Sequence, residues 1–144
     1  MQRREFIKSS CITCASLVGV SALASLLQSC ATLPTLKTDS KENTISIPET
    51  SFLENQNILI LKDPQLEFDI LVVKKKDHTY NAIYMQCSHQ NQPLSATKSG
   101  LFCASHGSAF DLEGNVTVAP ATDPLRKFKT EVNNFNIKIY LSKS

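Results

Sequence analysis

The stretch CSHQNQPLSATKSGLFCASHGSAF, residues 87–110, places a cysteine shortly before a histidine twice. Cys87 and His89 form a C-x-H pair, Cys103 and His106 form a C-x-x-H pair, and thirteen residues lie between the two pairs. The chain has three histidines in all, so two of the three are in this stretch. Each pair follows a run that is typical of a β-strand. We therefore expect two neighbouring loops to present two thiols and two imidazoles.

Such a donor set suits either a tetrahedral zinc ion or an iron–sulfur cluster. Zinc sites on paired loops usually group like ligands in short knuckles, whereas each loop here supplies one cysteine and one histidine. That arrangement allows both cysteines to bind one iron and both histidines to bind the other, as in a Rieske [2Fe–2S] centre. A Cys2His2 zinc site remains an alternative. A Cys87–Cys103 disulfide is a third, but it leaves both histidines unexplained.

The residues around the second pair extend the pattern. His106 is followed by Gly107, Ser108, an aromatic residue at position 110 and Asp111. A glycine turn at Gly114 and the proline-containing segment 119–125 come next. In this order the stretch resembles the Rieske family over roughly residues 45–141, and the double Cys-His motif carries the resemblance.

The resemblance implies a role for each motif residue. Cys87 and Cys103 would bind the inner iron, and His89 and His106 would bind the outer iron, nearer to solvent. Gly107 would let the backbone approach the cluster closely. The Ser108 hydroxyl would donate a hydrogen bond to a bridging sulfide and thereby raise the reduction potential.

Four positions depart from the quinol-oxidising members of the family. The two extra cysteines that form a disulfide there are Gln92 and Ser105 here, and the aromatic residue that usually carries a hydroxyl is Phe110. Gln90 stands where leucine is common. Because these changes remove hydrogen bonds and a disulfide, we expect a potential in the lower or middle part of the family range of about −150 to +300 mV.

The rest of the domain has a β pattern. Short apolar or alternating runs separated by turn residues, with no helical period, predict an all-β sandwich or barrel. The resemblance implies a small antiparallel β fold of the Rieske type, with two cluster-binding loops. The resemblance also implies that Phe102 and Phe110 lie in the core beside the cluster. The expected strands are residues 58–61, 68–73, 79–86, 100–102, 108–111, 116–118, 126–132 and 135–140.

Residues 1–29 have the features of an export signal, with a basic start followed by a short apolar stretch. The run from Arg3 to Lys8 resembles the twin-arginine signature, and residues 27–30 resemble a lipobox that would make Cys30 a lipid-modified residue. An uncleaved membrane anchor is the alternative. We predict a flexible tether over residues 30–44 and the folded domain over residues 45–144.

Net charge is +2, and the part after Cys30 has twelve basic and twelve acidic residues, so nothing indicates nucleic-acid binding. The predicted function is one-electron transfer by an exported, membrane-tethered protein on the periplasmic side, either as a carrier or as a small redox subunit. The expected partner is a cytochrome or an oxidoreductase. The alternatives are the iron–sulfur subunit of a quinol-oxidising cytochrome bc-type complex and a zinc-stabilised binding module. A Rieske hydroxylase is not expected, because such enzymes need a further catalytic domain with a mononuclear iron.

Overall fold

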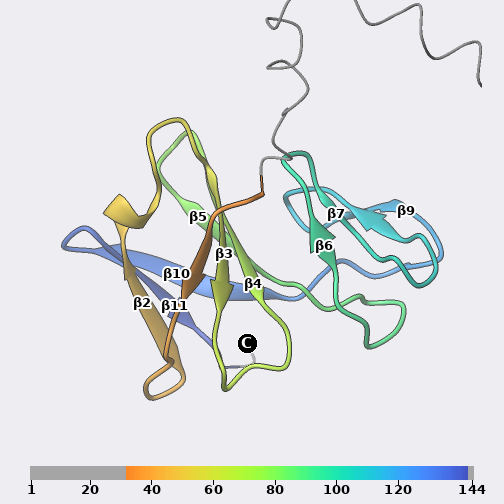
Figure 1. Cartoon of the computed structure of the whole chain (residues 1–144), viewed down its shortest axis with the longest axis horizontal. Helices are drawn as coiled ribbons and strands as arrows, with labels where there is room; N and C mark the ends of the chain where they lie inside the picture. Colours follow the sequence, from red (N-terminus) through yellow and green to blue (C-terminus); the bar gives the residue numbers. More distant parts are fainter. Residues whose placement is uncertain (1–31, 143–144) are drawn as a thin grey trace, which may run out of the picture. The chain divides into compact units, whose positions relative to one another are not determined.

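The computed structural model describes residues 32–142, so the predicted export signal and Cys30 lie outside the described residues. Within residues 32–142 no helix is long and apolar enough to span a membrane. The described strands form a seven-stranded sheet and a four-stranded sheet (Figure 1). The larger sheet has the order β1 (Thr35–Lys37), β3 (Ile58–Lys62), β4 (Ile70–Lys74), β5 (Tyr80–Tyr84), β10 (Lys127–Asn133), β11 (Asn136–Tyr140) and β2 (Thr44–Pro48). The smaller has the order β6 (Ser95–Ala96), β7 (Leu101–Phe102), β8 (Ala109–Phe110) and β9 (Val116–Val118).

Every strand pair except β1–β3 is antiparallel, and a short 3-10 turn, η2 (Glu49–Ser51), follows β2. The all-β prediction is therefore confirmed. The predicted glycine turn between β8 and β9 is also present, since Gly114 has a φ of +80°. Asn134 and Phe135, in the tight turn between β10 and β11, have positive φ as well.

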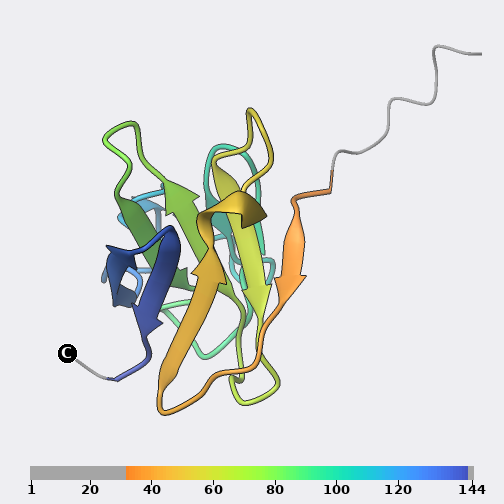
Figure 2. The ribbon, with the colours of Figure 1, turned by 90° about the vertical axis from the view of Figure 1, so that its left-hand side faces the viewer.

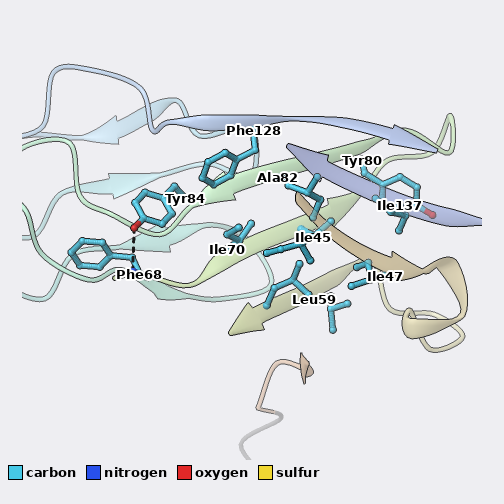
Figure 3. Close-up of a cluster of buried hydrophobic side chains, with 13 residues drawn as sticks. Ile45, Ile47, Leu59, Phe68, Ile70, Tyr80, Ala82, Tyr84, Phe128 and Ile137 are labelled. Carbon is cyan, nitrogen blue, oxygen red and sulfur yellow. Dashed lines mark hydrogen bonds between the residues drawn. The ribbon is translucent and has the colours of Figure 1, made fainter. Parts of the chain in front are cut away.

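The larger sheet curls so that the inward side chains of its strands meet in one apolar cluster (Figures 2 and 3). Ile45 and Ile47 of β2 meet Ile70 and Val72 of β4 there, although β2 is at one end of the strand order. Burial of apolar area of this kind contributes about 25 cal/mol per Å². The cluster therefore joins β2, at one end of the strand order, to strands near the other end.

The central strands β4 and β5 are buried on both faces. Side chains alternate along a strand, so Ile70 and Val72 face the first cluster while Leu71 and Val73 face a second one. This explains why the sequence of β4 is a continuous apolar run instead of an alternating one.

The second apolar cluster lies between the central strands and the smaller sheet. Leu71 and Ile83 pack there against Leu101 and Phe110, and the cluster also contains Cys87 and Cys103. The two cysteines are 3% and 2% exposed. The two sheets thus bury both thiols in the layer between them.

The segment predicted to be a flexible tether contains structure. β1 pairs in parallel with β3, and the buried Ser40 donates a hydrogen bond to Asp63 at 3.2 Å. Thr38 also donates its backbone N–H to the carbonyl of Lys62. In the described residues, regular pairing therefore begins about ten residues before Ile45.

We expect Gly100→Ala to destabilise the smaller sheet, because an added Cβ would collide with the backbone oxygen of Phe110. Backbone atoms cannot move aside as a flexible side chain can, so the expected loss of unfolding free energy is about 1–3 kcal/mol. Chemical denaturation measures the unfolding free energy of the variant. Lys98→Ala is the control, because Lys98 is nearby in the sequence and exposed. Equal stability of the two variants would contradict the close packing of β7 and β8.

A second stability prediction concerns Tyr80, whose hydroxyl donates to Glu49 at 2.8 Å and whose ring packs on Phe52. Burial, together with the hydrogen bond and the charge of Glu49, raises the pKa of Tyr80 to about 12. The folded chain therefore keeps this proton at a pH where the unfolded chain loses it. The stabilisation is complete below about pH 10 and is lost as the pH rises toward 12.

Tyr80→Phe should remove this part of the pH dependence and lower the unfolding free energy at pH 7 by about 1 kcal/mol. The measurement is the difference in unfolding free energy between wild type and variant, obtained by urea denaturation at several pH values from 7 to 11. A difference that stays constant across that range would contradict the raised pKa.

Candidate metal centre

The first of the two cysteine–histidine loops begins where β5 ends. An isolated β-bridge pairs Gln86 with Pro93, and Leu94 donates its N–H to the carbonyl of Met85 at 3.0 Å. Inside this closure the N–H of Cys87 donates to the carbonyl of Gln92 at 2.8 Å. These bonds hold residues 87–92 as a compact loop whose first residue points into the second apolar cluster.

The second loop connects β7 to β8. The N–H of Cys103 donates to the carbonyl of Ser108 at 2.8 Å, and the N–H of Gly107 donates to the carbonyl of Cys103 at 3.0 Å. Gly107 has a φ of +81°, a conformation that side-chain-bearing residues rarely adopt. An added Cβ there would have no protein atom within 4 Å. The positive φ, and not close packing, therefore explains why this position holds a glycine.

The structure brings the two thiols together and the two imidazoles together. Cys87 and Cys103 are buried in the same apolar cluster, are not joined by a disulfide, and are close enough for Cys87 to lower the pKa of Cys103. His89 and His106 are exposed, with their ring centroids 5.1 Å apart and their planes nearly perpendicular. The pairs therefore differ in their surroundings, with sulfur toward the core and imidazole toward solvent.

The electrostatics of the second loop favour a thiolate at Cys103. Burial opposes its ionisation, but the backbone N–H groups of Ser105 and His106 and the side chains of Cys87 and Ser105 outweigh burial and lower the pKa of this thiol. A metal binds the thiolate form of cysteine, so the loop is already arranged for a ligand. No three histidine, cysteine, aspartate or glutamate side chains within residues 32–142 converge as the ligands of a single metal ion.

A family model described as a Rieske [2Fe-2S] domain matches residues 46–129, which is more than half of the chain. The chain belongs to the Rieske family. Members bind a Rieske-type [2Fe–2S] cluster, so the chemistry of this chain is electron transfer through such a cluster. The donor set fits this group, since it offers two buried sulfurs and two exposed imidazole rings on facing loops.

Solved structures share the fold. The chain is similar to the plasma membrane Rieske protein PetC3 from Synechocystis PCC 6803, with 23% identity and a TM-score of 0.54 over 65% of this chain and 96% of that one. It is similar to a chain in the complex of reduced oxygenase and oxidized ferredoxin of carbazole 1,9a-dioxygenase, with 19% identity and a TM-score of 0.54 over 72% and 98% of the two chains. It also matches 33% of the quaternary ammonium Rieske monooxygenase CntA, with 21% identity and a TM-score of 0.55 over 69% of this chain. A search of curated proteins gives no match.

A third loop of this Rieske domain, residues 119–125, is hydrogen-bonded to a serine hydroxyl of each cysteine–histidine loop. Ser88 donates from its hydroxyl to the carbonyl of Asp123 at 2.6 Å. The fully buried Ser108 accepts a hydrogen bond from the N–H of Ala121 at 3.0 Å, which leaves the hydroxyl proton of Ser108 available for donation elsewhere. The role of Ser88 was not predicted from the sequence, because its partner lies 35 residues away.

The two aromatic residues expected in the core differ in position. Phe110 is 2% exposed and packs in the second apolar cluster, as predicted. The prediction for Phe102 was wrong, because this side chain is 44% exposed. Leu101 and Cys103 face the core, so strand alternation turns the residue between them to the outside.

Gln92 and Ser105, which stand at the positions of the two extra cysteines, each take part in hydrogen bonds within their loop. Gln92 supplies the carbonyl that accepts from Cys87, and Ser105 supplies donors to the Cys103 sulfur. Each of these two residues therefore makes its hydrogen bonds to the cysteine of its own loop.

Proposed function

We propose that Cys87 and Cys103 hold the inner iron of the [2Fe–2S] cluster and that His89 and His106 hold the outer iron. The observation that carries this proposal is the contrast between two buried, unbridged thiols and two exposed imidazoles at 5.1 Å between ring centroids. When bound, the cluster accepts and releases one electron. The burial of both thiols would keep water from the sulfur ligands.

The exposed imidazoles define where a partner would approach. His89 and His106 lie on the outer side of their loops, so a second protein could come within contact of both rings. We propose that the chain is an electron carrier or a small redox subunit that meets a cytochrome or an oxidoreductase at this end. A transient encounter of this kind needs only a small interface.

The departures from the quinol-oxidising members support a carrier over a quinol oxidase subunit. Gln92 and Ser105 cannot form the disulfide between the loops, and Phe110 has no hydroxyl to donate. Both features raise the reduction potential where they occur, and a high potential favours oxidation of quinol. We therefore propose a lower potential and a protein partner.

We further propose that the domain is exported and tethered to the membrane on the periplasmic side, with residues 1–29 as the signal and Cys30 as the lipid-modified residue. The twin-arginine-like run supports this, because that route carries folded proteins that already hold their cofactor. Metabolic labelling with a radioactive fatty acid tests the anchor, and Cys30→Ala is expected to lose the label and to leave the membrane fraction. Equal labelling of wild type and variant would contradict the anchor at Cys30.

The cofactor assignment has its own test. The protein purified from its native host is expected to be reddish-brown, with about two iron and two acid-labile sulfide per chain. A colourless protein with one zinc would contradict the proposed cluster ligands and would favour a zinc-stabilised module.

A further inference from the structure

A groove of about 400 Å³ lies beside the first cysteine–histidine loop. It reaches from His89 to the start of β10, so it is continuous with the face where we expect a partner to approach. Its lining residues are Gln86, Cys87, Ser88, His89, Gln90, Asn91, Pro124 and Arg126.

Arg126 is held in place at this groove by aromatic stacking. Its guanidinium carbon lies 4.7 Å from the ring centroid of Phe128 and 5.6 Å from that of Tyr84. One terminal nitrogen donates to the carbonyl of Leu141 at 3.1 Å. The salt bridges found among residues 32–142 do not include Arg126, so its charge has no carboxylate partner there.

The composition of the groove favours an anion. Apart from the imidazole of His89, the guanidinium of Arg126 is the one ionisable polar group exposed in the lining, and the amides of Gln86, Gln90 and Asn91 are neutral. A guanidinium is a planar fork of donors that matches the two oxygens of a carboxylate. A stacked arginine loses little further side-chain entropy when it binds such a group.

We propose that this groove receives an aspartate or glutamate side chain of the redox partner, and that Arg126 binds its carboxylate next to His89. This inference rests on the proposed function, because it assumes that a partner approaches the two imidazoles. The volume exceeds that of one carboxylate, so a loop of the partner can enter with it. The pairing would fix the register of the two proteins at the exposed imidazoles.

The equilibrium test uses the full chain with its cluster and a hexaglutamate peptide as the probe, titrated by calorimetry. Arg126→Gln is expected to weaken hexaglutamate binding about tenfold, the loss of one charge-assisted bidentate pair. Lys127→Gln is the matched control, because it removes the same charge from the adjacent exposed residue that does not line the groove. Equal weakening by both substitutions would overturn the proposal, since it would reduce the effect to net charge.

Free acetate, titrated at the same carboxylate concentration, separates a protein side chain from a small acid. Much weaker binding of acetate than of hexaglutamate is expected. Binding of equal strength would overturn the assignment to a partner side chain and would indicate a small-anion site.

A kinetic arm measures oxidation of the reduced protein by [Co(EDTA)]⁻, which carries carboxylates, and by ferricyanide, which has none. In each reaction one electron passes from the protein to the metal complex. Arg126→Lys is expected to retain the ferricyanide rate and to lose about fivefold or more of the [Co(EDTA)]⁻ rate, because lysine keeps the charge without the fork. Equal retention of both rates would contradict bidentate recognition.

The Rieske EPR signal of every variant distinguishes this inference from the proposed function. If all variants keep the EPR signal and the Arg126 and Lys127 variants bind hexaglutamate with the same affinity, only the proposed role of the groove is overturned. A wild-type protein without the signal would overturn the proposed function itself.

Discussion

Cys103→Ser is expected to abolish the Rieske EPR signal and to remove the visible absorption of the purified protein. Cys103 is 2% exposed and lies with Cys87 in the second apolar cluster. Substitution of a residue that only supports a metal ligand lowers metal affinity by roughly 10–100-fold. Substitution of a ligand itself should lower the affinity further. Iron analysis and EPR spectroscopy of the purified variant measure the effect.

Ser105→Ala provides the control within the same loop, since it removes a hydroxyl and leaves both thiols in place. It is expected to retain most of its iron. A Cys103→Ser protein that keeps its full iron content and EPR signal would contradict the ligand assignment.

The proposed histidine ligands allow the same test without damage to the core. His89 is exposed, so His89→Ala should remove the cluster while the fold of the larger sheet remains, as circular dichroism would detect. His78→Ala is the matched substitution, because His78 is exposed on the turn between β4 and β5. If both alanine variants keep the cluster, His89 is not a ligand.

Ser108→Ala is expected to lower both the stability of the domain and its reduction potential. Ser108 is fully buried and its oxygen accepts from the N–H of Ala121, so the alanine variant leaves a buried donor without a partner at a cost of about 1–3 kcal/mol. The bond from Ala121 leaves the hydroxyl proton free, and the resemblance to the Rieske family predicts that it would donate to a sulfide of the bound cluster. Since a donor near the cluster stabilises the reduced form, its loss should lower the midpoint by about 60 mV, the shift for a tenfold change in a one-electron equilibrium.

Ser88→Ala separates these two effects. It also removes a hydroxyl bond to the third loop, that to the carbonyl of Asp123, but Ser88 is exposed. We expect a smaller loss of stability and a smaller shift of the midpoint. A Ser108→Ala variant that loses stability and keeps the wild-type midpoint would show that this hydroxyl only holds the third loop.

The cysteine–histidine loops and most strands could be predicted because their signals are local. A C-x-H pair directly after an apolar run places Cys87 and His89 just beyond the end of β5, and a glycine with positive φ follows the second pair. Alternation along β11 likewise marks the face that packs in the first apolar cluster. β2, whose residues also alternate between exposed and buried, is not among the predicted strands.

The features that were missed depend on contacts between residues far apart in the sequence. β1 is three residues long and polar, and it is a strand because it pairs with β3, more than twenty residues later. The bonds from Ser88 to Asp123 and from Ala121 to Ser108, and the position of Arg126 beside the first loop, likewise arise only when the chain has folded. The resemblance to the family implied a buried Phe102, whereas alternation along its own strand turns this side chain outward, between the buried Leu101 and Cys103.

The central claim is that this chain holds a Rieske cluster whose potential is low or intermediate for the family. An EPR-monitored redox titration of the full chain, purified with its native metal, tests it most directly. We expect a Rieske-type signal with a midpoint in the lower or middle part of the range of about −150 to +300 mV. Absence of the signal would contradict the cluster, and a midpoint at the top of the range would contradict the roles given to Gln92, Ser105 and Phe110.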